Sequence, residues 1–211
     1  MIPVRILIAD DHEVVRQGVR TILEAQAGWV VCGEASTGRE AVVKAVDLRP
    51  TVVVLDIGMP ELNGLEATRQ IRRAVPAKIL ILTVHESEQM VTEVLAAGAD
   101  GYVVKTEAGQ KLVEAIRVLL RDHAFFTERV RPAGPSRRGA AARRGSGALT
   151  PRQREVVQLL AEGKSNKEIG AMLGMTTKTA ETHRTQIMAK LRVHSMSALV
   201  RYAIRNLIIE P

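Results

Sequence analysis

Residues 51–60 read Thr-Val-Val-Val-Leu-Asp-Ile-Gly-Met-Pro, an aliphatic run that ends in an aspartate, Asp56. A run without polar positions is typical of a parallel strand that helices cover on both faces. Outward from this stretch, further short apolar runs occupy residues 5–9, 29–35, 78–83 and 101–104. Segments with helical periodicity separate them. Alternating strands and helices predict an α/β fold, a doubly wound parallel five-stranded sheet.

The net charge of +7 is unevenly distributed along the 211 residues. Residues 1–130 hold 15 basic and 18 acidic residues, a net of −3, whereas residues 131–211 hold 15 basic and 5 acidic residues, a net of +10. This division predicts two modules with different partners, the second of which binds a polyanion. Between them, residues 131–147 contain five arginines, no acidic residue and almost no bulky apolar side chain. Such a composition predicts a flexible basic linker.

Several classes of protein do not fit this composition. The apolar runs span only a handful of residues, far fewer than the roughly 20 that a transmembrane helix needs. No basic and apolar signal segment precedes Asp10. The single cysteine, Cys32, cannot form an intramolecular disulfide, which fits a reducing compartment. We therefore expect a cytoplasmic protein with no membrane partner.

The basic module has strong signals for the beginnings of helices. Thr150 with Gln153 and Ser165 with Glu168 form two capping boxes, and two further helices are expected after them. A tight turn joins the second helix to the third, which predicts a helix-turn-helix. Gly170 interrupts the second helix, at an expected cost of about 0.5–1 kcal/mol relative to alanine.

Polar side chains follow the predicted strands of the first module where these strands end. Asp10 and Asp11 follow the first strand, Asp56 follows the third, and Thr83 and Lys105 end the fourth and the fifth. The carboxyl ends of parallel strands meet at one edge, so we expect these side chains to lie together. Clustered carboxylates repel one another, and Mg²⁺ would relieve this repulsion. An ammonium group and a hydroxyl beside the ion suit a phosphoryl group, which a carboxylate can accept.

Residues 3–122 resemble the receiver domain of two-component response regulators. The resemblance is carried by Asp10-Asp11, Leu55-Asp56-Ile57-Gly58-Met59-Pro60, Gly64, Thr83 and Gly101-Tyr102-Val103-Val104-Lys105. It implies a flavodoxin-like fold in which Asp56 accepts a phosphoryl group from a sensor histidine kinase. It also implies a Mg²⁺ site made by Asp10 (through water), Asp11, Asp56 and the Gly58 backbone carbonyl. The residues that would bind or sense the phosphoryl group are Thr83, Tyr102 and Lys105.

Residues 148–211 resemble the LuxR-type helix-turn-helix domain, and the whole chain resembles the NarL/FixJ family. The motifs are Leu149-Thr150-Pro151-Arg152-Gln153-Arg154-Glu155-Val156, Gly163-Lys164-Ser165-Asn166-Lys167-Glu168-Ile169 and Lys178-Thr179-Ala180-Glu181-Thr182-His183. The resemblance places the helix-turn-helix at about residues 166–185, with residues 123–147 as connector and linker. It implies binding of double-stranded DNA as a homodimer, with RNA polymerase as a further partner. The dimer contact would come from the last helix, through Met196, Leu199, Val200 and Ala203. The alternative interpretation is that these residues are simply part of the core.

The third helix of this module has one apolar and one polar face. Ala180, Ile187 and Leu191 form a buried stripe, and His183 is interpreted as a packed residue of the same stripe. A recognition helix inserts its N-terminal half into the major groove, so base contacts are expected from the opposite face, through Glu181, Thr182 and Thr185. Phosphate contacts are expected from Asn166, Lys167, Thr176, Thr177, Lys178, Arg184 and Lys190.

Two other functions fit part of the sequence. A phosphate-independent receiver would keep DNA binding, but every residue of the phosphoryl site is present. A Mg²⁺-dependent phosphohydrolase would use Asp56 as its nucleophile. Position 58, where such an enzyme would carry a general acid, is glycine, and the helix-turn-helix would have no role. We therefore predict a phosphorylation-dependent transcription regulator and not an enzyme.

Overall fold

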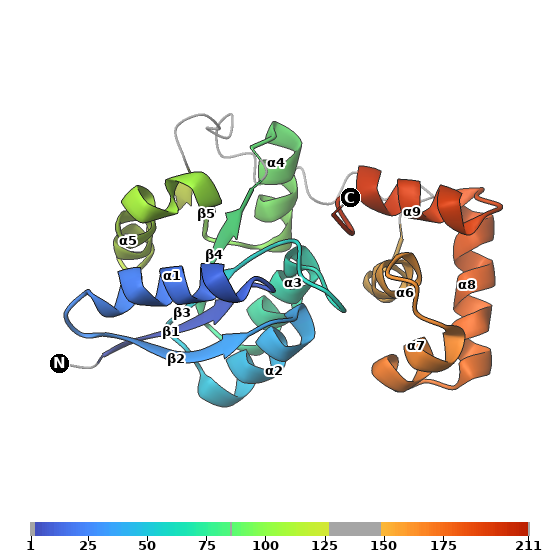
Figure 1. Cartoon of the computed structure of the whole chain (residues 1–211), viewed down its shortest axis with the longest axis horizontal. Helices are drawn as coiled ribbons and strands as arrows, with labels where there is room; N and C mark the ends of the chain where they lie inside the picture. The colour runs from blue at the N-terminus through green and yellow to red at the C-terminus, as the bar shows by residue number, and fades with distance from the viewer. Residues whose placement is uncertain (1–2, 85, 127–148, 211) are drawn as a thin grey trace. The chain divides into compact units, whose positions relative to one another are not determined.

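The structure of the protein is a computed structural model that describes residues 3–84, 86–126 and 149–210. The chain divides into two compact units, Met1–Pro135 and Ser136–Pro211, which Figure 1 colours along the sequence from blue to red. The predicted basic linker, residues 131–147, lies outside the described residues. Within the described ranges, no helix combines the length and the apolar character that crossing a membrane requires.

Strands and helices alternate along the N-terminal unit. The strands are β1 (Val4–Ala9), β2 (Trp29–Ala35), β3 (Val52–Leu55), β4 (Lys78–Thr83), β5 (Gly101–Val104) and β6 (Phe125–Phe126). The helices are α1 (Glu13–Glu24), α2 (Gly38–Leu48), α3 (Gly64–Ala74), α4 (Glu88–Ala97) and α5 (Ala108–Leu119), with a short 3₁₀ turn, η1 (Lys105–Glu107), before α5. All five predicted strands are present, and their bounds differ from the prediction by at most one residue.

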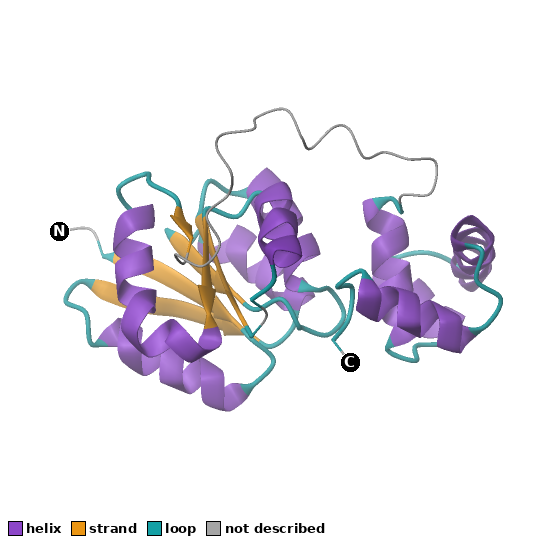
Figure 2. Cartoon of the chain, turned by 90° about the horizontal axis from the view of Figure 1, so that it is seen from above, coloured by secondary structure: helices purple, strands orange, loops and turns teal. Residues whose placement is uncertain are grey.

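All strands run parallel, in the order β2-β1-β3-β4-β5-β6. Helices α1 and α5 cover one face of the sheet and α2, α3 and α4 cover the other, so that Figure 2 shows the strands between two layers of helices. The predicted doubly wound parallel fold is confirmed. The connections reverse direction between β1 and β3, and doubly wound sheets bind ligands at the carboxyl ends of strands on either side of such a point.

The predicted number of strands is wrong, because a sixth strand extends the sheet. Strand β6 consists of Phe125 and Phe126, which pair with Gly101 and Tyr102 of β5. A segment of two residues is too short to show any periodicity in the sequence. A glycine in β5 suits this pairing, since a Cβ at position 101 would lie only 3.0 Å from the backbone oxygen of Phe125.

The central strands bury side chains on both faces, which explains their uninterrupted apolar sequences. Toward α1 and α5 the sheet presents alternate residues: Ile6, Ile8, Val52, Val54, Leu80, Leu82 and Val103. The residues between them point to the other face, because successive side chains of a strand alternate. They are equally buried, as Leu7, Val53 and Ile79 show. This packing on both sides keeps the strand ends at fixed positions relative to one another.

The described residues of the C-terminal unit form four helices, α6 (Pro151–Ala161), α7 (Asn166–Leu173), α8 (Thr177–Leu191) and α9 (Met196–Arg205). Both predicted capping boxes are confirmed: the hydroxyls of Thr150 and Ser165 accept from the amides of Gln153 and Glu168, whose side chains accept from the cap amides in return. Helix α7 ends at Gly174, which has a left-handed conformation (φ +65°) and turns the chain toward α8.

Gly170 inside α7 is explained by the turn that follows this helix. A Cβ at position 170 would lie 2.8 Å from the backbone oxygen of Met175 and 3.3 Å from the amide nitrogen of Thr177. Met175 also donates its amide hydrogen to the Gly170 carbonyl, at 2.9 Å. The close approach of α7 to the turn before α8 therefore offsets the helix-propensity cost of about 0.5–1 kcal/mol.

Gly64, the first residue of α3, lies against the backbone that follows β3, and this contact predicts an effect on stability. A Cβ at position 64 would lie 2.0 Å from the backbone oxygen of Asp56. We expect Gly64→Ala to lower the free energy of unfolding by about 3 kcal/mol, because the overpacked atoms belong to the backbone. The measurement is urea-induced unfolding of both proteins.

The matched control is Gly18→Ala in the interior of α1, where a Cβ would have nothing within 4 Å. It should raise the free energy of unfolding by about 0.5–1 kcal/mol, because alanine favours the helix. Similar effects of the two substitutions would contradict the role assigned to Gly64.

Candidate functional site

The pairing register of the sheet brings the predicted acidic residues together. Ala9 of β1 pairs with Leu55 of β3, so the next residues, Asp10 and Asp56, leave the sheet side by side. The Asp56 amide donates to the Ala9 carbonyl at 2.8 Å. Thr83 pairs with Val104 in the same way, which places Lys105 beside the end of β4.

The Lys105 ammonium group bridges two buried carboxylates. Its Nζ lies 2.7 Å from Asp10 Oδ2 and 2.9 Å from Asp56 Oδ2. The two aspartate side chains are only 3% and 4% exposed, whereas the Asp11 side chain is 32% exposed. One cation therefore serves two carboxylates that are withdrawn from water, while Asp11 lies at the open side of the site.

The electrostatic environment disfavours the ionised form of Asp56. Burial raises the pKa of this carboxyl from 3.8 to about 6; Lys105 opposes the shift and the neighbouring Asp10 adds to it. Burial by itself would lower the pKa of Lys105, but its hydrogen bond to Asp10 and its attraction to Asp56 raise it instead. The lysine thus stays protonated and holds a carboxylate that would otherwise bind a proton close to neutral pH.

The donor atoms at this edge fit a divalent cation. Single ligand atoms of Asp10, Asp11, His12 and Asp56 all lie within 4.8 Å of one another. Carboxylate oxygens are the ligands that Mg²⁺ prefers. His12 is largely exposed, with its Nδ1 2.7 Å from Asp11 Oδ1, as expected for a side chain at the rim. The role of the Gly58 carbonyl as a fourth ligand stays a prediction.

Thr83 and Tyr102, the predicted switch residues, are fully buried behind the acidic site, each with 0% of its surface exposed. Burial, together with the negative charges of Glu86 and Glu107, raises the pKa of the Tyr102 phenol to about 12. The phenol therefore stays neutral and can exchange hydrogen-bond partners without changing its charge.

The C-terminal unit presents half of the predicted contact residues on one exposed face of α8. The exposed residues are Thr177, Lys178, Glu181, Thr182 and Thr185, whereas Ala180 and Ile187 are buried in the core beneath. Thr176 is exposed but also caps α8 by accepting from the Thr179 amide at 3.1 Å. Lys167 is exposed at the beginning of α7. The predicted division of α8 into a core face and a polar face is confirmed.

Three of the predicted contact residues are half-buried instead of openly exposed. Lys190 Nζ donates to Gln153 Oε1 at 3.1 Å, which ties the end of α8 to the beginning of α6. Arg184 and Asn166 are half-buried. His183 is also half-buried, and its Nδ1 is shielded from solvent without a hydrogen-bond partner among the described residues, which agrees with a packed side chain.

The residues predicted for a dimer contact divide into two groups. Leu199 and Ala203 are fully buried in the core of their own unit, together with residues of α6 and α8. Met196 and Val200 are half-buried on α9. Only the second pair offers surface to another copy, and the dimer contact itself stays a prediction.

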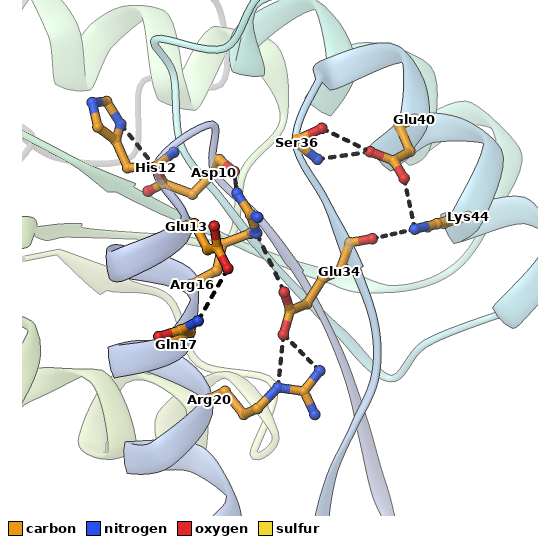
Figure 3. A network of polar contacts seen from close by, with 10 residues as sticks. All are labelled: Asp10, His12, Glu13, Arg16, Gln17, Arg20, Glu34, Ser36, Glu40 and Lys44. Carbon is orange, nitrogen blue, oxygen red and sulfur yellow. Dashed lines mark hydrogen bonds and ion pairs between the residues drawn. The ribbon is translucent and has the colours of Figure 1, made fainter.

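Two charged residues at the acidic site have no counterpart in the sequence prediction. Arg16 of α1 donates from Nη1 to the backbone carbonyl of Asp10 at 2.8 Å, and its Nε lies 3.3 Å from Glu34 Oε2 of β2 (Figure 3). In the sequence, Arg16 looks like any charged residue on the solvent-exposed face of a helix. Only the position of β2 beside β1 shows that the arginine reaches the acidic loop.

Comparison with known proteins assigns both units. Residues 6–117 match the family described as "Response regulator receiver domain", and residues 147–203 match "Bacterial regulatory proteins, luxR family". The chain belongs to the NarL/FixJ response regulators.

The similarity of this response regulator to curated relatives extends over nearly the whole chain. The transcriptional regulatory protein LiaR of Bacillus subtilis is 40% identical over 206 residues, which cover 96% of this chain and 98% of LiaR. The response regulator protein VraR of Staphylococcus aureus is 35% identical over 208 residues, 98% of this chain and 99% of VraR. A solved structure of RcsB from Salmonella typhimurium matches with a TM-score of 0.58 at 29% identity, covering 96% and 98% of the two chains.

The raised pKa of Asp56 predicts a stabilising substitution in this regulator. The folded-state pKa of about 6 exceeds the ordinary value of 3.8, so the ionised carboxylate lowers stability above pH 6, and this loss disappears as the pH falls toward 4. We expect Asp56→Asn to raise the free energy of unfolding by roughly 2–3 kcal/mol at pH 7.5 without divalent cations.

Urea-induced unfolding in EDTA at about pH 7.5 and about pH 4 measures this effect. Asp122→Asn is the control, because Asp122 is exposed at the surface, where it pairs with Lys78. A gain that is as large at pH 4 as at pH 7.5 would contradict the electrostatic explanation.

Proposed function

We propose that this chain is a DNA-binding response regulator in the cytoplasm. Its Asp56 accepts a phosphoryl group from a sensor histidine kinase, and the phosphorylated form regulates transcription as a dimer. The observation that supports the proposal most directly is the Lys105 ammonium group, 2.9 Å from Asp56 Oδ2 and 2.7 Å from Asp10 Oδ2, at the ligand-binding edge of the sheet. The chain acts as a phosphoryl acceptor and not as an enzyme on a separate substrate.

Phosphoryl transfer follows from the chemistry of this site. A carboxylate oxygen of Asp56 attacks the phosphorus of the kinase phosphohistidine, the P–N bond breaks, and the histidine nitrogen leaves with the electron pair. Asp11, Asp56 and the Gly58 carbonyl would hold Mg²⁺, with Asp10 acting through water, and the ion would offset the charge of the phosphoryl oxygens. Lys105 leaves the Asp56 carboxylate and donates to a phosphoryl oxygen, and the Thr83 hydroxyl donates to another.

Coupling to the rest of the molecule starts at Thr83 and Tyr102. A new dianionic group beside the end of β4 gives the Thr83 hydroxyl a strong acceptor. Tyr102 belongs to the adjacent strand, and both side chains are fully buried, so we propose that a shift of Thr83 is transmitted to Tyr102 through the packed core. This pair is proposed to bias the surface formed by α4, β5 and α5 between two states.

The polar face of α8 supports DNA as the ligand of the second unit. Glu181, Thr182 and Thr185 lie exposed between the beginning and the middle of α8, with Lys178 next to them. A solved structure of two RcsB dimers bound to two parallel DNAs matches this chain with a TM-score of 0.58 at 27% identity. By analogy, we propose binding of double-stranded DNA as a dimer, through the surface offered by Met196 and Val200, and contact with RNA polymerase.

The phosphoacceptor assignment predicts that Asp56→Asn abolishes phosphorylation. Wild-type protein incubated with labelled acetyl phosphate and Mg²⁺ should incorporate label and shift toward a dimer in size-exclusion chromatography. The Asp56→Asn protein should do neither, because the amide is not a nucleophile of comparable strength. Asp47→Asn on the exposed side of α2 is the control and should behave as wild type. Stable label in the Asp56→Asn protein would refute the assignment.

The proposed division of α8 into phosphate and base contacts predicts different effects on DNA binding for two nearby substitutions. Lys178→Ala should weaken binding to all DNA sequences and reduce the slope of log K against log salt by about 1, because one phosphate contact is lost. Glu181→Ala should cost about 1–3 kcal/mol on the preferred site and relax the preference at one base pair. Fluorescence anisotropy with specific and scrambled duplexes at several salt concentrations measures both effects. Identical changes for the two variants would contradict the division into phosphate and base contacts.

A further inference from the structure

The backbone and side chain of Asp10 are held at every polar atom. The amide donates to the Ala35 carbonyl at the end of β2, at 3.1 Å, and the carbonyl accepts from Arg16 at 2.8 Å. In the carboxylate, Oδ1 accepts from the His12 amide at 2.9 Å and Oδ2 pairs with Lys105 at 2.7 Å. The peptide group between Asp10 and Asp11 therefore has a fixed orientation, which also sets the direction in which Asp11 leaves the chain.

Arg16 is itself held by the strand that receives the Asp10 amide. Its Nε lies 3.3 Å from Glu34 Oε2, and Glu34 directly precedes Ala35 in β2. The Arg16 side chain is only 15% exposed, so its position is confined by packing as well as by charge. Strand β2 thus holds Asp10 twice, directly through the Ala35 carbonyl and indirectly through the pair of Glu34 and Arg16. Figure 3 shows the indirect contact.

Glu34 carries the charge that this arrangement needs. Burial would raise its pKa, but hydrogen bonds from Arg20 and Arg16 lower it below its ordinary value. Lys44 of α2 donates to the Glu34 backbone carbonyl and also pairs with Glu40 at 2.7 Å. Charged groups from α1 and α2 therefore converge on Glu34 at the end of β2.

We propose that Arg16, oriented by Glu34, is a positioning residue for the acidic site: its bond to the Asp10 carbonyl holds the Asp10-Asp11 loop in the geometry that binds Mg²⁺. The inference rests on the proposed function, since it concerns the cation used in phosphorylation of Asp56. Groups that orient metal ligands without touching the metal typically change affinity by about 10- to 100-fold when they are removed.

Electrostatic attraction alone predicts the opposite change in Mg²⁺ affinity when Arg16 is replaced, so the two explanations can be told apart. Arg16 is a cation close to the site, so the loss of its charge would strengthen the attraction for Mg²⁺. The loss of its bond to Asp10 frees the loop and weakens binding. The sign of the change in affinity therefore separates a positioning residue from a merely charged neighbour.

The experiment compares Arg16→Met with Arg20→Met in the full-length protein. Arg20 lies one turn further along α1 and pairs with the same Glu34, at 2.6 Å from Oε1, but it has no contact with Asp10 among the interactions described. Isothermal titration calorimetry with MgCl₂ measures the affinity, and urea-induced unfolding measures the stability of each protein. The rate of phosphorylation by acetyl phosphate is then recorded as a function of Mg²⁺ concentration.

The expected result is that Arg16→Met binds Mg²⁺ about 10- to 100-fold more weakly, whereas Arg20→Met binds like wild type or slightly more tightly. Phosphorylation of Arg16→Met should recover at high Mg²⁺ concentration. Arg16→Lys retains the charge and one donor, so it should recover part of the affinity. It serves as the test if Arg16→Met does not fold.

Unchanged or tighter binding by Arg16→Met would overturn the proposal, and so would an equal loss in Arg20→Met. The proposed function fails separately: wild-type protein that neither binds Mg²⁺ nor accepts a phosphoryl group would refute it, whatever the variants do.

Discussion

The structure depends on one constraint, the level at which β1 and β3 end. Their in-register parallel pairing places Ala9 opposite Leu55, and the chain leaves the sheet with an aspartate on each strand. Two carboxylates that are less than 5% exposed are thereby placed beside each other, and the Lys105 ammonium group forms an ion pair with both. A shift of one residue in this register would point either aspartate to the opposite face. The buried pair of Asp10 and Asp56, which the lysine bridges, is a consequence of this pairing.

The acidic site opposes the stability of the fold that carries it. The raised pKa of Asp56 means that the ionised carboxylate is held at a cost, which a proton, a divalent cation or a phosphoryl group with its cation can relieve. Functional sites often keep such unfavourable electrostatics, and the surrounding core supplies the compensating stability. Here the core is aliphatic and packed on both faces of the sheet, so the strand ends cannot relax apart. Relief of this free-energy cost would therefore favour the binding of a cation beside Asp56.

The C-terminal unit obtains its stability differently. Its helices are short, and their beginnings are secured by capping hydroxyls at Thr150, Ser165, Thr176 and Ser195. A compact cluster of residues from all four helices forms its core, and the exposed polar side chains of α8 are not part of it. Lys190 is an exception, because it joins α8 to α6 through Gln153. Rigid presentation of one polar face suits contact with a regular polyanion.

The sequence by itself determined the strands, the capped helices and the identity of the acidic residues, because apolar periodicity and capping are local properties of the chain. It did not predict β6 or the need for glycine at positions 64 and 170, and it left open whether Leu199 and Ala203 belong to the core or to a dimer contact. Nor did it predict the bond from Arg16 to Asp10. Each of these depends on segments that are distant in the chain and meet only in the folded unit. Close approach, register and charge pairing across elements are decided by packing, which no local pattern of residues encodes.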